Sequence, residues 1–235
     1  MKKEILSILL LSALGLIACD DGKIYTNNNI TTTEGSVLRI TTNICGINDW
    51  PEGYSVVIAG FDNTDYATIS KGIPAPEKDG ETVDVILSGI STEVSQVEVC
   101  VINRLRKRIA TFYKADFTAQ DDTVFLNAGT INAGMFNSIQ KTVFDSHCIA
   151  CHGTSTSAAG GLYLTEGKSY EALVNVKADL SPEGKMLVNP GNTNDSFILD
   201  ILLANTTRHD HSDILSVMPE KITLLQSWIE GGAKE

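Results

Sequence analysis

Short runs of alternating or β-branched apolar residues dominate the chain between residues 30 and 131. Polar or glycine-containing turn sequences separate these runs, at positions 34–35, 48–53, 62–63, 74–76 and 79–80. Alternation with a period of two is typical of half-buried strands, and seven or eight such strands at turn-bounded intervals favour an antiparallel sandwich. The pattern therefore predicts strands over 30–33, 37–45, 54–61, 66–69, 82–87, 94–102, 108–114 and 123–126.

The hydrophobic period changes after a turn-rich stretch at 127–134. Phe136, Ile139 and Val143 recur at helical spacing, and similar patterns follow later in the chain. We expect helices over 135–146, 169–175 and 196–205, and a last helix that starts after Pro219 and ends before the glycines at 231–232. These patterns predict a β domain over 30–131 and a helical domain over 132–235.

The N-terminus carries the pattern of an export signal. Lys2 and Lys3 precede an apolar run over 5–18, which is too short for a membrane-spanning helix. The segment that ends in Ala18 and Cys19 resembles the lipobox of bacterial lipoproteins. That resemblance implies a signal peptide over 1–18, cleavage before Cys19, acyl chains on this cysteine, and a lipidated tether over 19–29. It places the protein in a bacterial cell envelope, on the periplasmic side or at the outer-membrane or cell surface.

The net charge of −11 limits the kinds of partner that the protein is expected to bind. An acidic protein is unsuited to nucleic acid and to anionic lipid surfaces, so membrane attachment would run through the lipid on Cys19. A basic cluster at 104–108 fits a solvated hairpin better than a docking patch.

The strongest chemical signal is the sequence Cys-Ile-Ala-Cys-His over 148–152. Cys-x-x-Cys-His is the pattern of covalent c-type haem attachment. Cys148 and Cys151 lie one helical turn apart, so each thiol can bond one vinyl group of the same porphyrin, and His152 then lies under the iron as the proximal ligand. The motif predicts one haem c per chain.

Two further cysteines, Cys45 and Cys100, lie in the predicted β domain. In an exported protein they could form a disulfide, and we predict this pairing.

Residues 136–233 resemble a class I c-type cytochrome domain. The matching stretches occur in the family's order at 148–153, 160–164, 188–191, 218–219 and 228–233. The resemblance covers under half of the chain and implies an all-α fold around one haem. It also implies that Met218 is the distal iron ligand and that the carbonyl group of Pro190 orients the imidazole of His152.

The residues themselves offer other candidate ligands. Met186, His209 and His211 are alternatives to Met218. Met218 is preferred because Pro219 and the last helix restrict the movement of its loop, and because a thioether ligand favours reduced iron. A zinc site would need ligands beyond the motif, such as His147 or His209. It would also use Cys151 and His152, which are adjacent in sequence and therefore poorly placed for a tetrahedral site. A thioredoxin-like thiol pair would need a βαβ context.

The expected fold class is therefore a multidomain protein, in which an immunoglobulin-like or fibronectin-like antiparallel sandwich precedes an all-α cytochrome c domain. The expected function is one-electron transfer to or from an unidentified redox partner protein, rather than enzymatic catalysis. One alternative is a cell-surface lipoprotein that binds a glycan or protein through exposed aromatics such as Trp50, Tyr54 and Tyr66, with an auxiliary haem domain. Another is a haem-based sensor or enzyme with an open iron position.

Overall fold

The computed structural model describes residues 35–153 and 158–235 of the chain. The predicted signal peptide, the lipidated Cys19, the tether and the strand expected over 30–33 lie outside the described residues. Among the described residues, no helix combines the length and the apolar composition needed to cross a membrane.

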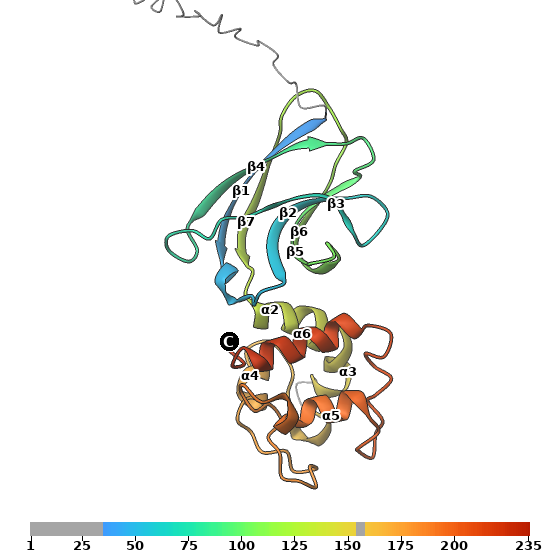
Figure 1. Ribbon diagram of the computed structural model, residues 1–235. Helices are drawn as coiled ribbons and strands as arrows, with labels where there is room; N and C mark the ends of the chain where they lie inside the picture. The colour runs from blue at the N-terminus through green and yellow to red at the C-terminus, as the bar shows by residue number, and fades with distance from the viewer. Residues whose placement is uncertain (1–34, 154–157) are drawn as a thin grey trace, which may run out of the picture. The chain divides into compact units, whose positions relative to one another are not determined.

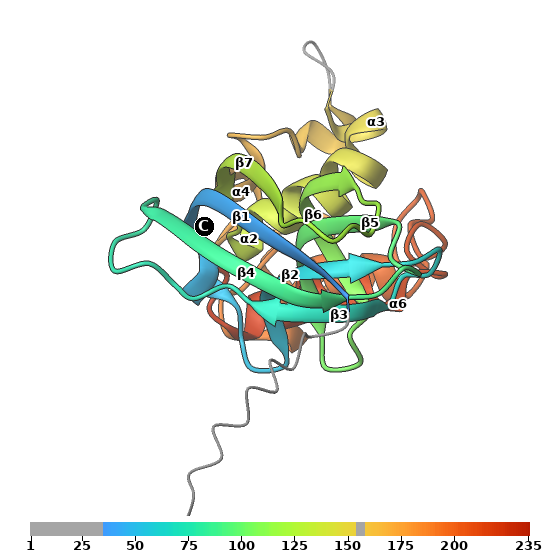
Figure 2. The ribbon, with the colours of Figure 1, turned by 90° about the horizontal axis from the view of Figure 1, so that it is seen from above.

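Seven strands form two sheets (Figures 1 and 2). One sheet has the order β4-β1-β7 and the other has the order β3-β2-β5-β6. Alternate residues of β4 are buried, as in Val83, Val85 and Leu87, which explains the period of two in the sequence. Both sheets contribute apolar side chains to one core. The strands are β1 (Ser36–Cys45), β2 (Tyr54–Phe61), β3 (Ala67–Gly72), β4 (Thr82–Ile90), β5 (Gln96–Asn103), β6 (Arg108–Asp116) and β7 (Val124–Asn132).

The expectation of purely antiparallel sheets is wrong at one edge. Strand β7 runs parallel to β1, with Leu38 opposite Val124 and Cys45 opposite Asn132. The alternation of side chains is the same in parallel and antiparallel strands, so the pattern could not distinguish them. Because β1 and β7 are parallel, their C-terminal ends lie side by side at the same end of the sheet. There β7 leads into the first α-helix.

The ends of β1 and β7 are held in close contact. Ala133 donates a backbone hydrogen bond of 2.8 Å to the carbonyl of Cys45, and Trp50 donates from its indole nitrogen to the carbonyl of Ala133 at 2.6 Å. A side chain at Gly46 would place its Cβ 2.4 Å from the backbone nitrogen of Gly134, and the φ of Gly46 is +77°. Glycine is therefore required at position 46 both by space and by backbone conformation.

The expected all-α domain is not present in the described residues, and this part of the predicted fold class is wrong. The regular structure of the protein is mostly β-sheet, and the helices of the second half are short. The α-helices are α2 (Met135–Ile139), α3 (Ile149–His152), α4 (Ser169–Leu173), α5 (Phe197–Leu203) and α6 (Pro219–Glu230), of which only α6 reaches twelve residues. The shorter 3-10 helices are η1 (Ile47–Asp49), η3 (Ala159–Gly161) and η4 (Thr193–Asp195).

Glycines in the left-handed region interrupt the chain between α3 and α5. Gly160, Gly161, Gly167, Gly184 and Gly191 all have positive φ, and they stand between α3 and α5. A residue with positive φ cannot continue a right-handed helix. Extended segments follow instead, and isolated bridges pair Val174 with Val188 and Lys177 with Met186.

Candidate functional site

Cys148, Cys151 and His152 lie at the end of a continuous helical segment of unusual geometry. Helix α2 leads into the π-helix η2 (Gln140–Cys148), and η2 leads into α3. A π-helix bonds each residue to the fifth along rather than the fourth, and such segments are rare and often occur at functional sites. The thiol of Cys148 lies 3.6 Å from the carbonyl oxygen of Val143, five residues earlier, so the wide turn reaches the first residue of the motif.

The two thiols differ in their surroundings. Cys148 is half-buried and packs against the apolar core, whereas Cys151 is exposed. Burial, and to a smaller extent the neighbouring Cys151, raises the pKa of the Cys148 thiol to about 11. Cys148 is therefore held as a neutral thiol at ordinary pH, while the sulfur of Cys151 is open to reagents.

A buried glutamine connects the π-helix to the segment that follows the motif. Gln140 donates from its amide nitrogen to Asp145 Oδ1 at 2.7 Å and to the carbonyl of Leu164 at 2.9 Å. Its amide oxygen accepts from the hydroxyl of Ser169 at the start of α4. Leu164 in turn donates its backbone N–H to the carbonyl of His152 at 2.8 Å. This network holds the motif against residues 164–169.

The imidazole of His152 has one nitrogen engaged. Its Nδ1 lies 3.2 Å from the carbonyl oxygen of Leu162, so Nδ1 donates to this carbonyl and Nε2 is the ring nitrogen left for another partner. A hydrogen bond of this kind orients a metal-binding histidine. The sequence-based assignment gave this role to Pro190, and the structure gives it to Leu162. The segment at Pro190 is instead tied to α6, because Gly191 donates to the carbonyl of Ile229 at 2.7 Å.

The structure places a second histidine beside His152. The ring centroids of His152 and His211 lie 6.2 Å apart, with 34° between the ring planes. His211 belongs to the loop between α5 and α6, and its Nδ1 lies 2.9 Å from the carbonyl oxygen of His209. His211 is half-buried, and this burial lowers its pKa, which favours the neutral imidazole.

Met218 occupies the N-cap position of α6. Its side chain is half-buried and packs against the apolar core. Its backbone N–H donates to the carbonyl of Leu215 at 2.9 Å, and its own carbonyl accepts from Lys221 at 2.9 Å. Met186, the other methionine considered, takes part in bridges to Lys177 and Ser196 through its backbone.

Cys45 and Cys100 are both free thiols, so the predicted disulfide is not formed. Cys45 ends β1 in one sheet, and Cys100 lies in the middle of β5 in the other sheet. Cys100 belongs to a separate apolar cluster with Val57, Phe61 and Ile102, apart from the main core between the sheets. Sequence separation and export cannot show on which sheet or face a cysteine lies, which is why the pairing was wrong.

The described residues contain no group of three or more His, Cys, Asp or Glu side chains arranged to hold a metal ion. Haem iron needs only one or two protein ligands, because the porphyrin supplies the others. The pair of thiols and the imidazole with a free Nε2 thus fit the attachment of a haem. A structural zinc ion would need four protein ligands.

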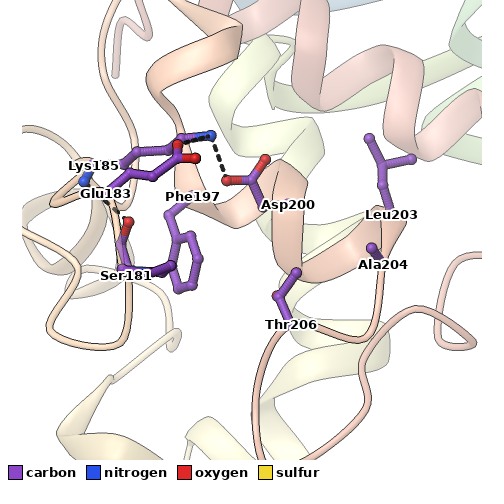
Figure 3. A pocket seen from close by; sticks show the side chains of 9 residues that line it. Ser181, Glu183, Lys185, Phe197, Asp200, Leu203, Ala204 and Thr206 are labelled. Carbon is purple, nitrogen blue, oxygen red and sulfur yellow. Dashed lines mark hydrogen bonds and ion pairs between the residues drawn. The ribbon is translucent and has the colours of Figure 1, made fainter.

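A pocket of about 430 Å³ lies away from the motif, beside α5 (Figure 3). Lys185 is its shared cation, because Lys185 Nζ lies 2.7 Å from Asp200 Oδ2 and 3.3 Å from Glu183 Oε2. Phe197, Leu203 and Thr206 complete part of its wall. The set of one cation and two carboxylates therefore carries a net negative charge.

Most side chains proposed for surface recognition are used in packing or ion pairing. Trp50 and Tyr54 form a tilted aromatic pair with centroids 5.5 Å apart, and only Tyr66 of the three aromatics is exposed by as much as 50%. Within the basic cluster, Arg104 pairs with Glu52, Lys107 with Glu220, and Arg108 with Asp65 and Glu98.

Sequence analysis identified the motif but missed the groups that support it. Gln140 and Leu162 carry no signal, because a glutamine in a helix is commonly exposed and a backbone carbonyl has no sequence signature. Comparison of the chain with protein-family models, curated proteins and solved structures finds no match. The chemistry of the site residues is therefore the basis on which a function can be proposed.

Proposed function

We propose that this protein is a membrane-anchored monohaem c-type cytochrome that carries single electrons. The observation that supports this most directly is the arrangement of Cys148, Cys151 and His152 at the end of one helical segment. The carbonyl of Leu162 engages Nδ1 of His152, so that Nε2 is the nitrogen available to iron.

The attachment would use the two thiols directly. Each S–H would add across one vinyl group of the porphyrin, with the sulfur bonding one carbon and the hydrogen the other, so that no oxidant and no leaving group is needed. Cys151 is exposed, and Cys148 packs against the core, so one sulfur faces solvent and the other anchors the group to the folded chain. When bound, the haem supplies an iron that changes its charge by one electron.

The chain's own residues would set the conditions for this chemistry. His152 would hold the iron from one side, and the loop before α6, which contains His211 and Met218, would supply the ligand on the other side. An iron held by His152 and by a residue of this loop would be bound by the protein on both sides, which favours electron transfer over reaction with oxygen or peroxide. The Gln140 network would keep the helical segment and residues 162–169 in place around the group.

The remainder of the chain fits a carrier held at a membrane. A lipid on Cys19 would anchor it in the bacterial cell envelope, and the two-sheet part would act as a spacer or docking domain for the redox partner protein. The net charge of −11 would favour a partner with a basic surface.

The test is covalent attachment of haem. The full chain is produced in a bacterium with a haem-attachment system, denatured, and separated from free haem before its spectrum is recorded. We expect one haem to remain with the wild-type chain and none with the double variant Cys148→Ala, Cys151→Ala. The variant Cys45→Ala, which removes a half-buried cysteine outside the motif, is the matched control and should keep its haem. A wild-type chain without covalent haem would contradict the proposal.

A further inference from the structure

The distance between the rings of His152 and His211 can be compared with the distance between two imidazoles bound to one metal ion. The ring centroids of His152 and His211 are 6.2 Å apart. A bond from a metal ion to an imidazole nitrogen is about 2.0 Å long, and that nitrogen lies about 1.1 Å from the ring centre, so two rings on opposite sides of one ion have centroids about 6 Å apart. The observed centroid separation of 6.2 Å matches this span. The angle of 34° between the rings is compatible with this, because each ring can rotate about the axis through the iron.

The hydrogen bonds of both rings point to the same role. Nδ1 of His152 faces the carbonyl of Leu162 at 3.2 Å, and Nδ1 of His211 faces the carbonyl of His209 at 2.9 Å. The hydroxyl of Thr207 donates to the same His209 carbonyl at 2.6 Å and lies 3.4 Å from His211 Nδ1. Each ring thus uses Nδ1 to donate to a carbonyl, which leaves Nε2 as the ring nitrogen for another partner. A metal-binding histidine commonly donates its other ring N–H in this way.

Met218 stands at the start of α6. Its side chain packs against the apolar core, and its backbone begins α6 through hydrogen bonds to Leu215 and Lys221. His209, next to His211, is exposed and differs from it in this respect.

We propose that His211, rather than Met218, is the second axial ligand of the haem iron. This inference rests on the proposed function, because it requires the haem that Cys148 and Cys151 would attach. Two imidazoles donate more electron density to iron than an imidazole and a thioether, and a methionine ligand raises the reduction potential of c-type haems. The reduction potential of this protein is therefore expected to lie below that of carriers with a methionine ligand.

The experiment compares three variants of the full haem-loaded chain: His211→Ala, Met218→Ala and His209→Ala. Each is first tested for covalent haem, and its spectrum is recorded in the oxidised and reduced states, before and after carbon monoxide. The wild type should be low-spin and should not bind carbon monoxide. His211→Ala should lose the low-spin spectrum and bind one carbon monoxide per haem, and added imidazole should restore the low-spin spectrum. Met218→Ala and His209→Ala should behave like the wild type.

The outcomes separate the two proposals. Absence of covalent haem in the wild type would overturn the proposed function itself. Covalent haem with an open iron only in Met218→Ala would overturn the assignment of His211 and leave the carrier function in place. Covalent haem that binds carbon monoxide in the wild type, or a His211→Ala variant that stays low-spin, would equally overturn the assignment.

Discussion

Arg108 on β6 forms an ion pair with Glu98 on β5, and the carboxylate of Glu98 is fully buried. The same carboxylate accepts a hydrogen bond of 2.7 Å from the hydroxyl of Thr111. The guanidinium of Arg108 also lies 4.5 Å from the ring centre of Phe61 and 2.7 Å from Asp65. Arg108 therefore neutralises a buried charge within an otherwise apolar surface of the sheet.

The variant Arg108→Ala should be strongly destabilised. Removal of one partner of a buried ion pair leaves an uncompensated charge, which costs about 3 kcal/mol of unfolding free energy. Urea unfolding followed by circular dichroism measures the difference. Arg39→Ala is the matched control, because Arg39 pairs with Asp84 where 48% and 38% of the two side chains are exposed, and such a pair adds little to stability. Equal losses in the two variants would contradict the role assigned to Arg108.

The variant Gln140→Ala should loosen the region around the motif. It would leave the carbonyl of Leu164 and the hydroxyl of Ser169 without their partner in a buried site, which costs about 2 kcal/mol. Hydrogen exchange should show faster exchange over residues 164–173 than in the wild type. The exposed Gln120 provides the control, since Gln120→Ala removes no buried hydrogen bond of its side chain. Unchanged exchange in Gln140→Ala would show that this network does not hold the segment.

The free thiols should react in a fixed order in the haem-free protein. We expect an alkylating reagent to modify Cys151 first, because it is exposed, and Cys100 last, because it is buried in a strand. The pKa of Cys148 is raised to about 11, so at pH 8 it is almost wholly protonated, and its reaction should accelerate as the pH approaches that value. Mass spectrometry of peptides after timed labelling measures the order.

The same experiment tests the absence of a disulfide. Without reductant, unfolded protein should show Cys45 and Cys100 as two additional reactive thiols. Their resistance to labelling until a reductant is added would contradict the free thiols of the structure.

Strands were predictable where buried and more exposed residues alternate along the chain. Val83, Val85 and Leu87 alternate with exposed residues, so β4 could be located from its pattern. The direction of β7 could not be derived in this way, since pairing with β1 depends on where the chain returns. The helices expected over 169–175, 196–205 and from Pro219 to the glycines at 231–232 correspond to α4, α5 and α6 to within about two residues, whereas the all-α domain that the resemblance implies is not present in the described residues.

The sequence by itself determined that Cys148, Cys151 and His152 lie together, because they are near enough in the chain that a local helix brings them to one group. The tertiary structure decided which distant groups join them. Leu162, rather than Pro190, faces Nδ1 of His152, and His211 lies at 6.2 Å from its ring. These relationships arise from loops whose paths depend on packing and backbone hydrogen bonds across the whole second half. A linear pattern carries information on periodicity and spacing, and it cannot specify which loop closes over a site.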